Sequence, residues 1–142
     1  MPEPKLRPDV TPELMIERAK GYLPEWMGVE PVEISLGKVV TRLEIKPHHT
    51  APNGFLHAAS VIALADTTCG YATFAHLPEN GKNFTTIELK SNHLGTAREG
   101  AIRATATAQH LGGRTHVWDA VVEDESNGKT IALFRCTQMI LT

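Results

Sequence analysis

Asp66 is the residue whose surroundings in the sequence most favour chemistry. It lies inside an apolar stretch, between residues 62–65 (IALA) and residues 69–70 (CG), and no Lys or Arg occurs between Lys46 and Lys82. Carboxylates are rarely buried without a partner, because the loss of solvent disfavours the charged form. Two explanations remain open: Asp66 acts as an acid, base or nucleophile, or its side chain reaches solvent or caps backbone amides at a kink.

His57 stands nine residues earlier, at the expected start of the same helix. The first backbone N–H groups of a helix have no acceptor within the helix, and the helix dipole is positive there. The Ala58 amide can therefore donate to a carbonyl oxygen that becomes negative in a transition state. The alternative for His57 is a loop histidine whose hydrogen bonds are already satisfied.

The spacing of His57 and Asp66 adds a constraint. At about 100° and about 1.5 Å per residue, the two side chains lie on opposite sides of a helix and roughly 13 Å apart along its axis. One chain cannot bring both to one substrate atom. If both act in catalysis, the site combines the helix start of one subunit with Asp66 of another, and a homodimer is required for activity.

The elements that must position these residues begin after a short segment, residues 1–10, that we expect to be a flexible tail. Thr11-Pro12-Glu13 then supplies a hydroxyl cap, a proline at the first helical position and an acid in the first turn. Apolar residues recur at helical spacing until Pro24, where the helix is expected to stop. The pattern next alternates with a period of two, which predicts a hairpin of Glu30–Gly37 and Lys38–Lys46.

A long apolar helix is predicted from about Leu56 to about His76, after a loop over Pro47–Gly54 that holds two prolines and an Asn-Gly pair. Turn residues divide the remainder into four strands, which we expect to form an antiparallel meander: Phe84–Leu94, Gly100–Leu111, Thr115–Glu125 and Thr130–Leu141. A helix that is apolar nearly all round must be covered on most sides, which one curved antiparallel sheet of about six strands achieves. The sequence therefore predicts an α+β fold in a single domain over residues 11–142.

Composition and charge exclude several classes of partner. The 142 residues carry a formal charge of −2 from 14 basic and 16 acidic side chains spread along the chain, so no global field attracts nucleic acid or an anionic membrane. Prolines and charges near the N-terminus do not fit a signal peptide. Because His57, Asp66 and His76 interrupt the apolar stretch, we expect the buried helix of a cytoplasmic protein and not a membrane span.

Cysteines and neighbouring histidines are expected to have structural roles. Cys69 and Cys136 lie in apolar surroundings and are expected to be buried thiols. Cys69 shares a helix face with Asp66, but no basic residue accompanies it, so a pocket-lining hydrophobe is favoured over a second nucleophile. His48 and His49 have no further ligands at suitable spacing, so we expect solvated loop histidines and no metal site.

Residues 53–72 (NGFLHAASVIALADTTCGYA) resemble the signature of the hotdog-fold acyl-CoA thioesterases. In that signature a loop leads into His-Gly-Gly, and an Asp or Glu nine residues after the His is the nucleophile or general base. Residues 91–100 (SNHLGTAREG) and 110–120 (HLGGRTHVWDA) are similar to the dihydroxynaphthoyl-CoA and aryl-CoA thioesterases, and residues 131–136 (IALFRC) resemble the phenylacetate-pathway thioesterase. The resemblance implies a long central helix wrapped by a curved sheet, and hydrolysis of an aryl or medium-chain acyl-CoA to free acid and CoA.

Carried over to this chain, the resemblance implies Asp66 as nucleophile or general base, with His57 and the Ala58 amide polarising the thioester carbonyl. Thr86 matches a position that orients water or borders the acyl group. CoA is then part of the substrate, and no cofactor is implied. Two segments match regions that contact CoA in the family: His93, Leu94, Gly95 and Thr96, and His110, Leu111, Gly112, Gly113, Arg114 and Thr115.

Arg114 lies in a glycine-flanked turn, where a guanidinium can reach a nucleotide phosphate. The alternative for Arg114 is an exposed turn residue without a ligand. The chain also departs from the family pattern at two places. His57 is followed by two alanines where the family has two glycines, so the added methyl groups either crowd the thioester or narrow the pocket. Ala51 stands where the family has Gln or Asn, and Asn53 is the candidate to supply that amide through a rearranged loop.

Two other functions remain open. The same fold hosts acyl-thioester dehydratases and hydratases, which use a His and an acid. The departures from the family pattern also allow an acyl-CoA binding module without catalytic power. Phe55, Tyr71 and Thr86 suit an aromatic or a medium aliphatic acyl group equally well, and the fold often forms dimers of dimers, so a homotetramer is expected.

Overall fold

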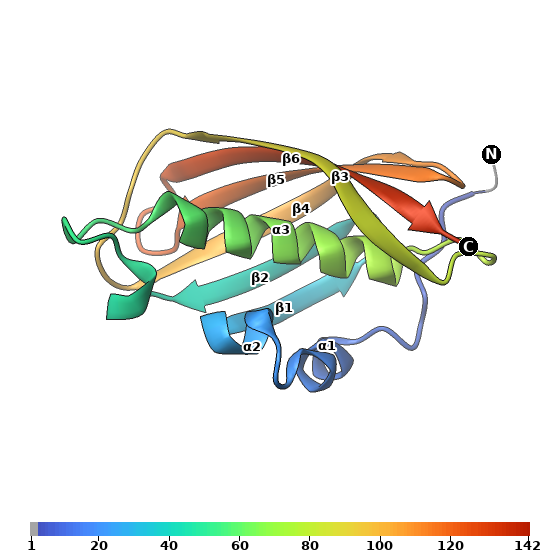
Figure 1. The fold of residues 1–142 in the computed structure, drawn as a ribbon, viewed down its shortest axis with the longest axis horizontal. Coiled ribbons are helices and arrows are strands. Elements are labelled where there is room, and N and C mark those ends of the chain that lie inside the picture. The colour runs from blue at the N-terminus through green and yellow to red at the C-terminus, as the bar shows by residue number, and fades with distance from the viewer. Residues whose placement is uncertain (1–2) are drawn as a thin grey trace.

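The computed structural model describes residues 3–142. The helices are α1 (Pro12–Ala19), α2 (Leu23–Met27) and α3 (Ala58–Ala75), with a 3-10 helix at Pro47–His49. The strands are β1 (Val29–Ser35), β2 (Lys38–Glu44), β3 (Asn83–His93), β4 (Ala101–Leu111), β5 (Thr115–Asp124) and β6 (Thr130–Leu141). They form one antiparallel sheet in the order β1-β2-β4-β5-β6-β3, which curves around α3 (Figure 1). This confirms the predicted α+β architecture of a long helix wrapped by a curved sheet.

The side of α3 that faces the sheet packs on both small and large side chains. Leu64 and Ala65 of the helix are fully buried. The inward-facing positions of β4 and β5 hold three alanines, Ala104, Ala106 and Ala120, beside Ile102, Trp118 and Val122, and all six are at most 1% exposed. Small side chains let the helix approach the sheet closely, and an interior packed in this way has little spare volume.

A buried polar contact joins α3 to β2. Thr68 Oγ1 donates to the Leu64 carbonyl at 2.7 Å, and the hydroxyl oxygens of Thr41 and Thr68 lie 2.6 Å apart. Because a hydroxyl has one proton, Thr41 is the donor in this second bond. The contact fixes the rotation of α3 about its axis, and so the side of the helix on which Asp66 lies.

The predicted meander of four consecutive strands is wrong in part. β4, β5 and β6 pair in sequence, but the other neighbour of β4 is β2, and β3 pairs with β6. Because β4 has a partner on both sides, the strand that follows α3 pairs at the far side of the sheet. β3 is therefore an edge strand, and most of its side chains are exposed.

The N-terminal segment forms two helices where one was predicted. α1 begins at the predicted cap, where Thr11 Oγ1 accepts the Leu14 N–H at 3.1 Å, and it ends at Ala19. Gly21, with φ of 83°, allows the chain to turn there. Pro24 then lies in the first turn of α2, where its missing N–H is not needed, so it begins a helix instead of ending one.

Part of the predicted tail packs against the body of the protein. The Arg7 N–H donates to the Ala75 carbonyl at 2.8 Å. Val10 is buried with Met15 and Ala75, and Leu6 packs against this cluster. Residues 1 and 2 of the predicted tail lie outside the described residues. The segment from Leu6 to Val10 therefore helps to hold α1 against the end of α3.

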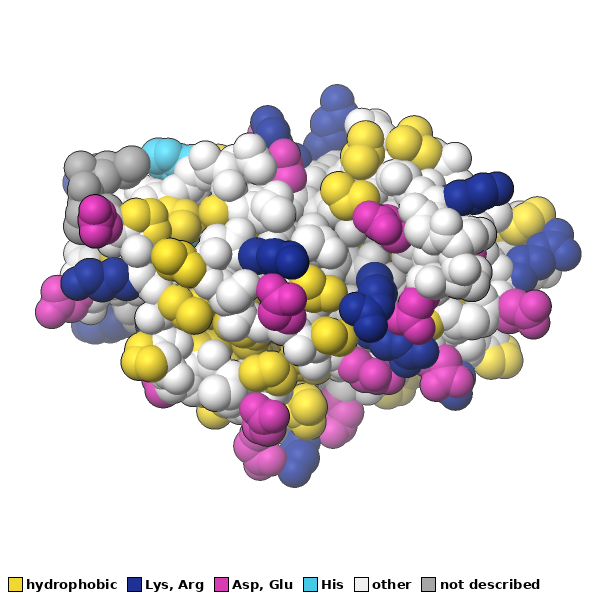
Figure 2. All heavy atoms as spheres, turned by 180° about the vertical axis from the view of Figure 1, so that it is seen from behind, with side chains coloured by type: hydrophobic (Ala, Val, Ile, Leu, Met, Phe, Trp, Pro, Cys, Tyr) yellow, Lys and Arg dark blue, Asp and Glu magenta, His cyan; other side chains and the backbone are white. Residues whose placement is uncertain are grey.

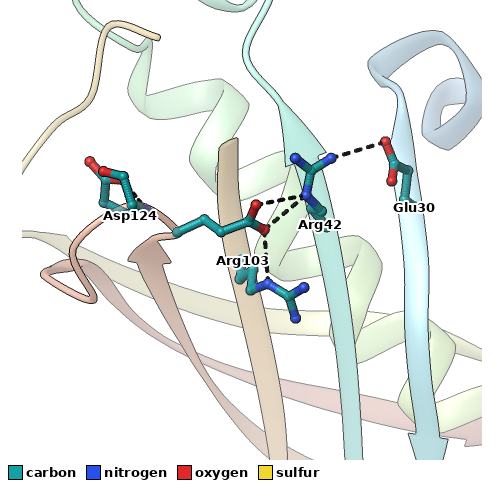
Figure 3. Close-up of polar contacts among 6 residues, drawn as sticks. Glu30, Arg42, Arg103 and Asp124 are labelled. Carbon is teal, nitrogen blue, oxygen red and sulfur yellow. Dashed lines mark hydrogen bonds and ion pairs between the residues drawn. The ribbon is translucent and has the colours of Figure 1, made fainter. Parts of the chain in front are cut away.

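Charged side chains on the outer face of the sheet pair across strands (Figure 3). Arg42 on β2 and Arg103 on β4 both donate to Glu125, which follows β5, at 2.8 and 2.9 Å, and Arg42 lies 3.5 Å from Glu30 on β1. Seen from this side, basic and acidic side chains are interspersed with hydrophobic ones (Figure 2). Exposed pairs of this kind contribute little to stability individually. Their mixture of signs agrees with the absence of a global field expected from composition.

Candidate active site

A cavity of about 490 Å³ runs along the side of α3 that the sheet leaves uncovered. α3 contributes five residues to its walls: Asp66, Thr67, Gly70, Tyr71 and Phe74. β3 and β6 contribute Asn83, Phe84, Thr86 and Gln138, and the N-terminal helices with their linker contribute Met15, Arg18, Ala19, Tyr22 and Pro24. The cavity is mostly aromatic and apolar, with a few polar groups, as is usual for sites that bind small organic molecules.

Asp66 supplies the only carboxylate among the residues that line the cavity. Its Oδ1 atom is buried, and the side chain makes no hydrogen bond or ion pair within residues 3–142. Burial raises the pKa of the Asp66 carboxyl above its ordinary value. Capping of backbone amides, one form of the alternative left open by the sequence, is thus excluded within the described chain, whereas the half-buried side chain does reach the open cavity. A carboxylate in this state is suited to accept a proton or attack a carbon.

Thr86 and Gln138 lie on paired strands beside Asp66. The Thr86 hydroxyl donates to Gln138 Oε1 at 2.8 Å, and both side chains line the cavity. Gln138 is fully buried, and its amide nitrogen donates to Cys136 Sγ at 3.5 Å. Thr86 was predicted as a site residue from the family resemblance, whereas Gln138 was missed. A polar residue among the apolar inward-facing positions of residues 130–141 is the signal that could have found it.

His57 caps the start of α3. Its Nδ1 accepts the Ala59 N–H at 2.9 Å, and its ring is exposed. A neutral ring with an accepting Nδ1 carries its proton on Nε2, which is then free to donate. The Ala58 N–H has no acceptor within residues 3–142. The helix start therefore offers two free donors, the Ala58 amide and His57 Nε2.

The loop before α3 is held by a buried histidine. His49 was expected to be a solvated loop residue, but it is only 1% exposed, so that prediction is wrong. Its Nδ1 accepts the Lys46 N–H at 2.9 Å, so Nε2 donates to the Met27 carbonyl at 2.7 Å. The His49 carbonyl accepts the His57 N–H at 3.0 Å and the Ser60 hydroxyl at 2.8 Å. His49 thus ties the helix start to α2, a role that local sequence does not reveal.

Asn53 does not reach the cavity. Its Oδ1 accepts the Phe55 N–H at 3.1 Å within the loop, and its side chain is exposed. Phe55, another expected pocket residue, is also absent from the cavity walls, and the guanidinium of Arg98 lies over its ring. Tyr71 and Thr86 do line the cavity.

One chain does not bring the helix start and the carboxylate together. The cavity walls around Asp66 include neither His57, Ala58 nor Asn53. α3 is continuous from Ala58 to Ala75, so the axial separation of about 13 Å between His57 and Asp66 applies. The structure of one chain therefore contains two halves of the predicted site, one at the start of α3 and one along its exposed side.

The two predicted CoA segments lie at opposite ends of the sheet. His93 pairs with Ala132 of β6 and Thr115 pairs with Met139, seven residues further along that strand. At about 3.3 Å per residue the segments 93–96 and 110–115 are roughly 23 Å apart. The first lies near the start of α3, since the Leu56 N–H donates to the Ala97 carbonyl. The second lies near the end of the sheet that carries Phe84.

Both segments depend on glycine. At Gly95 a Cβ atom would come within 3.1 Å of the Thr130 carbonyl oxygen, and at Gly112 it would lie 2.6 Å from His110 Nε2 and 3.1 Å from the Thr115 carbonyl oxygen. His93, Leu94, Thr96 and Arg114 are exposed.

No group of three or more His, Cys, Asp or Glu side chains that could hold a metal occurs within residues 3–142. Over the same residues no helix is long and apolar enough to cross a bilayer.

Known proteins resemble this chain over most of its length. The family model described as the thioesterase superfamily matches residues 53–131, more than half of the chain. The 1,4-dihydroxy-2-naphthoyl-CoA hydrolase of Listeria monocytogenes is 32% identical over 115 residues, which cover 81% of this chain and 92% of that protein.

Solved structures of other proteins share the fold of this chain. A mutant of thioesterase PA1618 from Pseudomonas aeruginosa superimposes with a TM-score of 0.90 at 24% identity, covering 96% of this chain and 97% of the other. The PaaI protein of the Escherichia coli phenylacetic acid degradation operon superimposes with a TM-score of 0.80 at 22% identity, covering 92% and 90%. The fold and the family expected from residues 53–72 are thus both confirmed, and the chain belongs to the thioesterase superfamily with the hotdog fold.

Proposed function

We propose that this protein hydrolyses an aryl or medium-chain acyl-CoA, with Asp66 as nucleophile or general base, at a site shared between two subunits. The observation that carries the proposal is the Asp66 carboxylate, which lines an open apolar cavity without a hydrogen-bonding or ionic partner in residues 3–142. Such a group costs stability, and a role in catalysis explains why it is kept. Membership of the thioesterase superfamily supplies the reaction.

In the proposed reaction the thioester carbonyl oxygen binds at the start of a helix α3. The Ala58 N–H and His57 Nε2 donate to it as it becomes negative. Asp66 of the other subunit either takes a proton from a water that attacks the carbonyl carbon and passes it to the departing thiolate, or attacks that carbon itself. In the second case the CoA thiolate leaves and takes a proton from solvent, and a water then hydrolyses the acyl-aspartyl anhydride to the free acid. The segments 93–96 and 110–115, with Arg114, are proposed to contact CoA, whose phosphates suit a guanidinium.

The exposed edge of β3 supports the shared site. β3 has β6 on one side and no strand on the other within the described chain. Ile87 and Leu89 on it are 53% and 42% exposed. An apolar unpaired edge is a liability unless another chain covers it. A twofold dimer made through β3 lets the exposed side of α3 in each subunit meet a partner, and two such dimers form the proposed homotetramer.

Substitution of Asp66 tests the activity. We expect Asp66→Asn to lower kcat for an acyl-CoA by at least about 100-fold, which is the usual contribution of a general base. Asp119→Asn is the matched control, because Asp119 is paired with Arg135 on the outer face of the sheet. Unchanged turnover in Asp66→Asn would refute the proposal. Water addition to an enoyl-CoA, or tight binding without turnover in the wild-type protein, would instead support the dehydratase or the binding module.

Mixed variants test the shared site. His57→Ala and Asp66→Asn are each inactive alone, but a heterodimer of the two has one intact site out of two. After subunit exchange at equal concentrations, half of the dimers are heterodimers, so about a quarter of the wild-type activity should return. Failure of the mixture to recover activity, with exchange verified by native mass spectrometry, would show that each site lies within one chain. Single turnover in ¹⁸O water separates the two roles of Asp66, because only a nucleophile acquires the label.

A further inference from the structure

Two hydrogen-bond donors without protein acceptors line the cavity beyond Asp66. The Tyr71 hydroxyl is buried and has no hydrogen-bond partner within residues 3–142. The Arg18 guanidinium, which also lines the cavity, makes no ion pair or hydrogen bond within the same residues. Buried polar groups in native proteins are nearly always satisfied, so the buried and unpartnered Tyr71 hydroxyl calls for an acceptor from outside residues 3–142, which it can meet when its ring turns toward the cavity.

Relative to Asp66, both donors lie toward the C-terminal end of α3. Tyr71 and Phe74 follow Asp66 on α3 by five and eight residues, which places them about 7.5 and 12 Å further along the helix axis. Arg18, on α1, is held over the Phe74 ring with its Cζ atom 4.2 Å from the ring centroid. The stacking orders a side chain that is otherwise exposed. An acyl group whose carbonyl carbon lies at Asp66 and which extends through the cavity toward the end of α3 therefore approaches Phe74 and Arg18, with Tyr71 about 140° around the helix from Asp66.

The chemistry of these two donors limits what they can bind. A guanidinium has no acceptor atom and keeps its charge, so Arg18 recognises an oxygen that carries negative charge. Burial raises the pKa of Tyr71 to about 12, so its hydroxyl remains a neutral donor at any physiological pH. The rings of Phe74, Phe84 and Tyr22 also line the cavity and suit a flat apolar body.

We propose that the acyl group of the substrate carries a carboxylate at its far end, and that Arg18 and Tyr71 of this chain select it by donating to that carboxylate. The inference rests on the proposed thioester hydrolysis and names the class of acyl group for the same site. Arg18 and Tyr71 are specificity-determining residues, since neither touches the reacting carbon. A hydroxyl group at the far end of the acyl group can accept a hydrogen bond from Tyr71, but it carries no charge and therefore interacts less strongly with Arg18.

Three matched thioesters test the proposal: phenylacetyl-CoA, 4-hydroxyphenylacetyl-CoA and 4-carboxyphenylacetyl-CoA. For the wild-type protein we expect kcat/KM to be about tenfold higher for the carboxylate than for the unsubstituted compound, mainly through KM, with the hydroxyl between them. Arg18→Gln should abolish the advantage of the carboxylate over the hydroxyl and leave only the smaller preference that Tyr71 gives over the unsubstituted compound. Tyr71→Phe should reduce the preference for both oxygen-bearing substrates.

Arg7→Gln is the control for Arg18. Arg7 also lies over the Phe74 ring, with its Cζ atom 5.1 Å from the centroid, but it does not line the cavity. The ratio of specificity constants should be unchanged in this variant. A wild-type ratio near one, or an equal loss of the ratio in Arg7→Gln and Arg18→Gln, would overturn the proposal. Circular dichroism and unfolding midpoints establish that the variants are folded.

A binding measurement separates this inference from the proposed reaction. The three acyl groups can be presented as thioether analogues of CoA that cannot be hydrolysed, and their Kd values compared by titration calorimetry. If none of the thioesters turns over, the proposed hydrolysis fails, but the tenfold preference in Kd and its reduction in Arg18→Gln still decide the inference. If turnover occurs and the Kd values are equal, the hydrolysis stands and the inference is refuted.

Discussion

The Thr86 hydroxyl lies 2.8 Å from Gln138 Oε1, across two paired strands and inside the cavity that holds Asp66. Because an amide oxygen can only accept, the proton of Thr86 is used in this bond. The lone pairs of the Thr86 oxygen remain available, so a water bound in the cavity can donate to it. That arrangement would leave the oxygen of the water free to attack a carbonyl carbon.

Replacement of Thr86 by Val should therefore have two effects. The fully buried Gln138 loses the donor to its Oε1 atom, which should lower the free energy of unfolding by about 1–2 kcal/mol. Turnover should fall by about tenfold because the water loses one acceptor. Urea unfolding and a thioester assay measure the two effects. Thr86→Ser, which keeps the hydroxyl, should retain both properties, and equal behaviour of the Val and Ser variants would contradict this role.

His57 has a structural and a chemical role that substitution can separate. Its Nδ1 caps the Ala59 N–H, so His57→Ala should cost about 1 kcal/mol of stability as well as activity. Asn is among the best capping residues, so His57→Asn should recover the stability. It should not recover the activity if Nε2 donates to the substrate. Thermal unfolding and kcat measured on both variants test this, and an active Asn variant would show that the ring is needed only as a cap.

The Asp66 carboxyl should make the folded protein less stable as the pH rises. Its pKa is raised by burial, so the folded protein binds the proton more tightly than the unfolded chain does. The cost of burying the charge is absent below the ordinary pKa and develops as the pH rises through the folded-state pKa. Asp66→Asn should then be more stable than the wild-type protein at pH 7, with a difference that disappears near pH 4. A constant difference across this range, measured by urea unfolding, would contradict the assignment.

His116 should act in the opposite sense. It is 1% exposed on β5, near His76 and His110, and burial lowers its pKa to about 4. The unfolded chain has a histidine pKa near 6.5, so its contribution is fully present above about pH 6.5 and is lost as the pH falls toward 4. The loss is on the order of 3 kcal/mol at pH 4. His116→Gln should flatten the stability curve between these values, and an unchanged curve would contradict the prediction.

Local patterns in the sequence predict individual elements well and their neighbours poorly. The last three strands of the sheet and α3 fall within two residues of their expected bounds, because alternation and continuous apolarity are local properties of the chain. The place of β3 beside β6 depends on which edges remain free after β2 and β4 pair. Pro24 was misassigned because a proline that ends one helix and a proline that begins the next look alike in sequence.

The residues of the candidate site also divide into those that local sequence predicts and those that depend on tertiary packing. Asp66 was predicted from the cost of burying a charge, and the structure places it in a cavity without a partner. The contribution of Met15, Arg18 and Tyr22 to that cavity could not be predicted, because it depends on how α1 packs against α3. His49 was missed for a related reason, since its acceptor is a carbonyl 22 residues earlier.

The three alanines that face α3 set how high the helix stands above the sheet. A substitution such as Ala104→Val would add volume where none is spare, and the simplest relief is to lift α3 outward. Asp66 would move with it, which would change its position relative to Thr86 and to the partner subunit of the proposed dimer. The rate of the proposed reaction would then change, although the added methyl groups never contact the substrate. The buried positions between α3 and the sheet are therefore sites at which substitutions could alter catalysis from a distance.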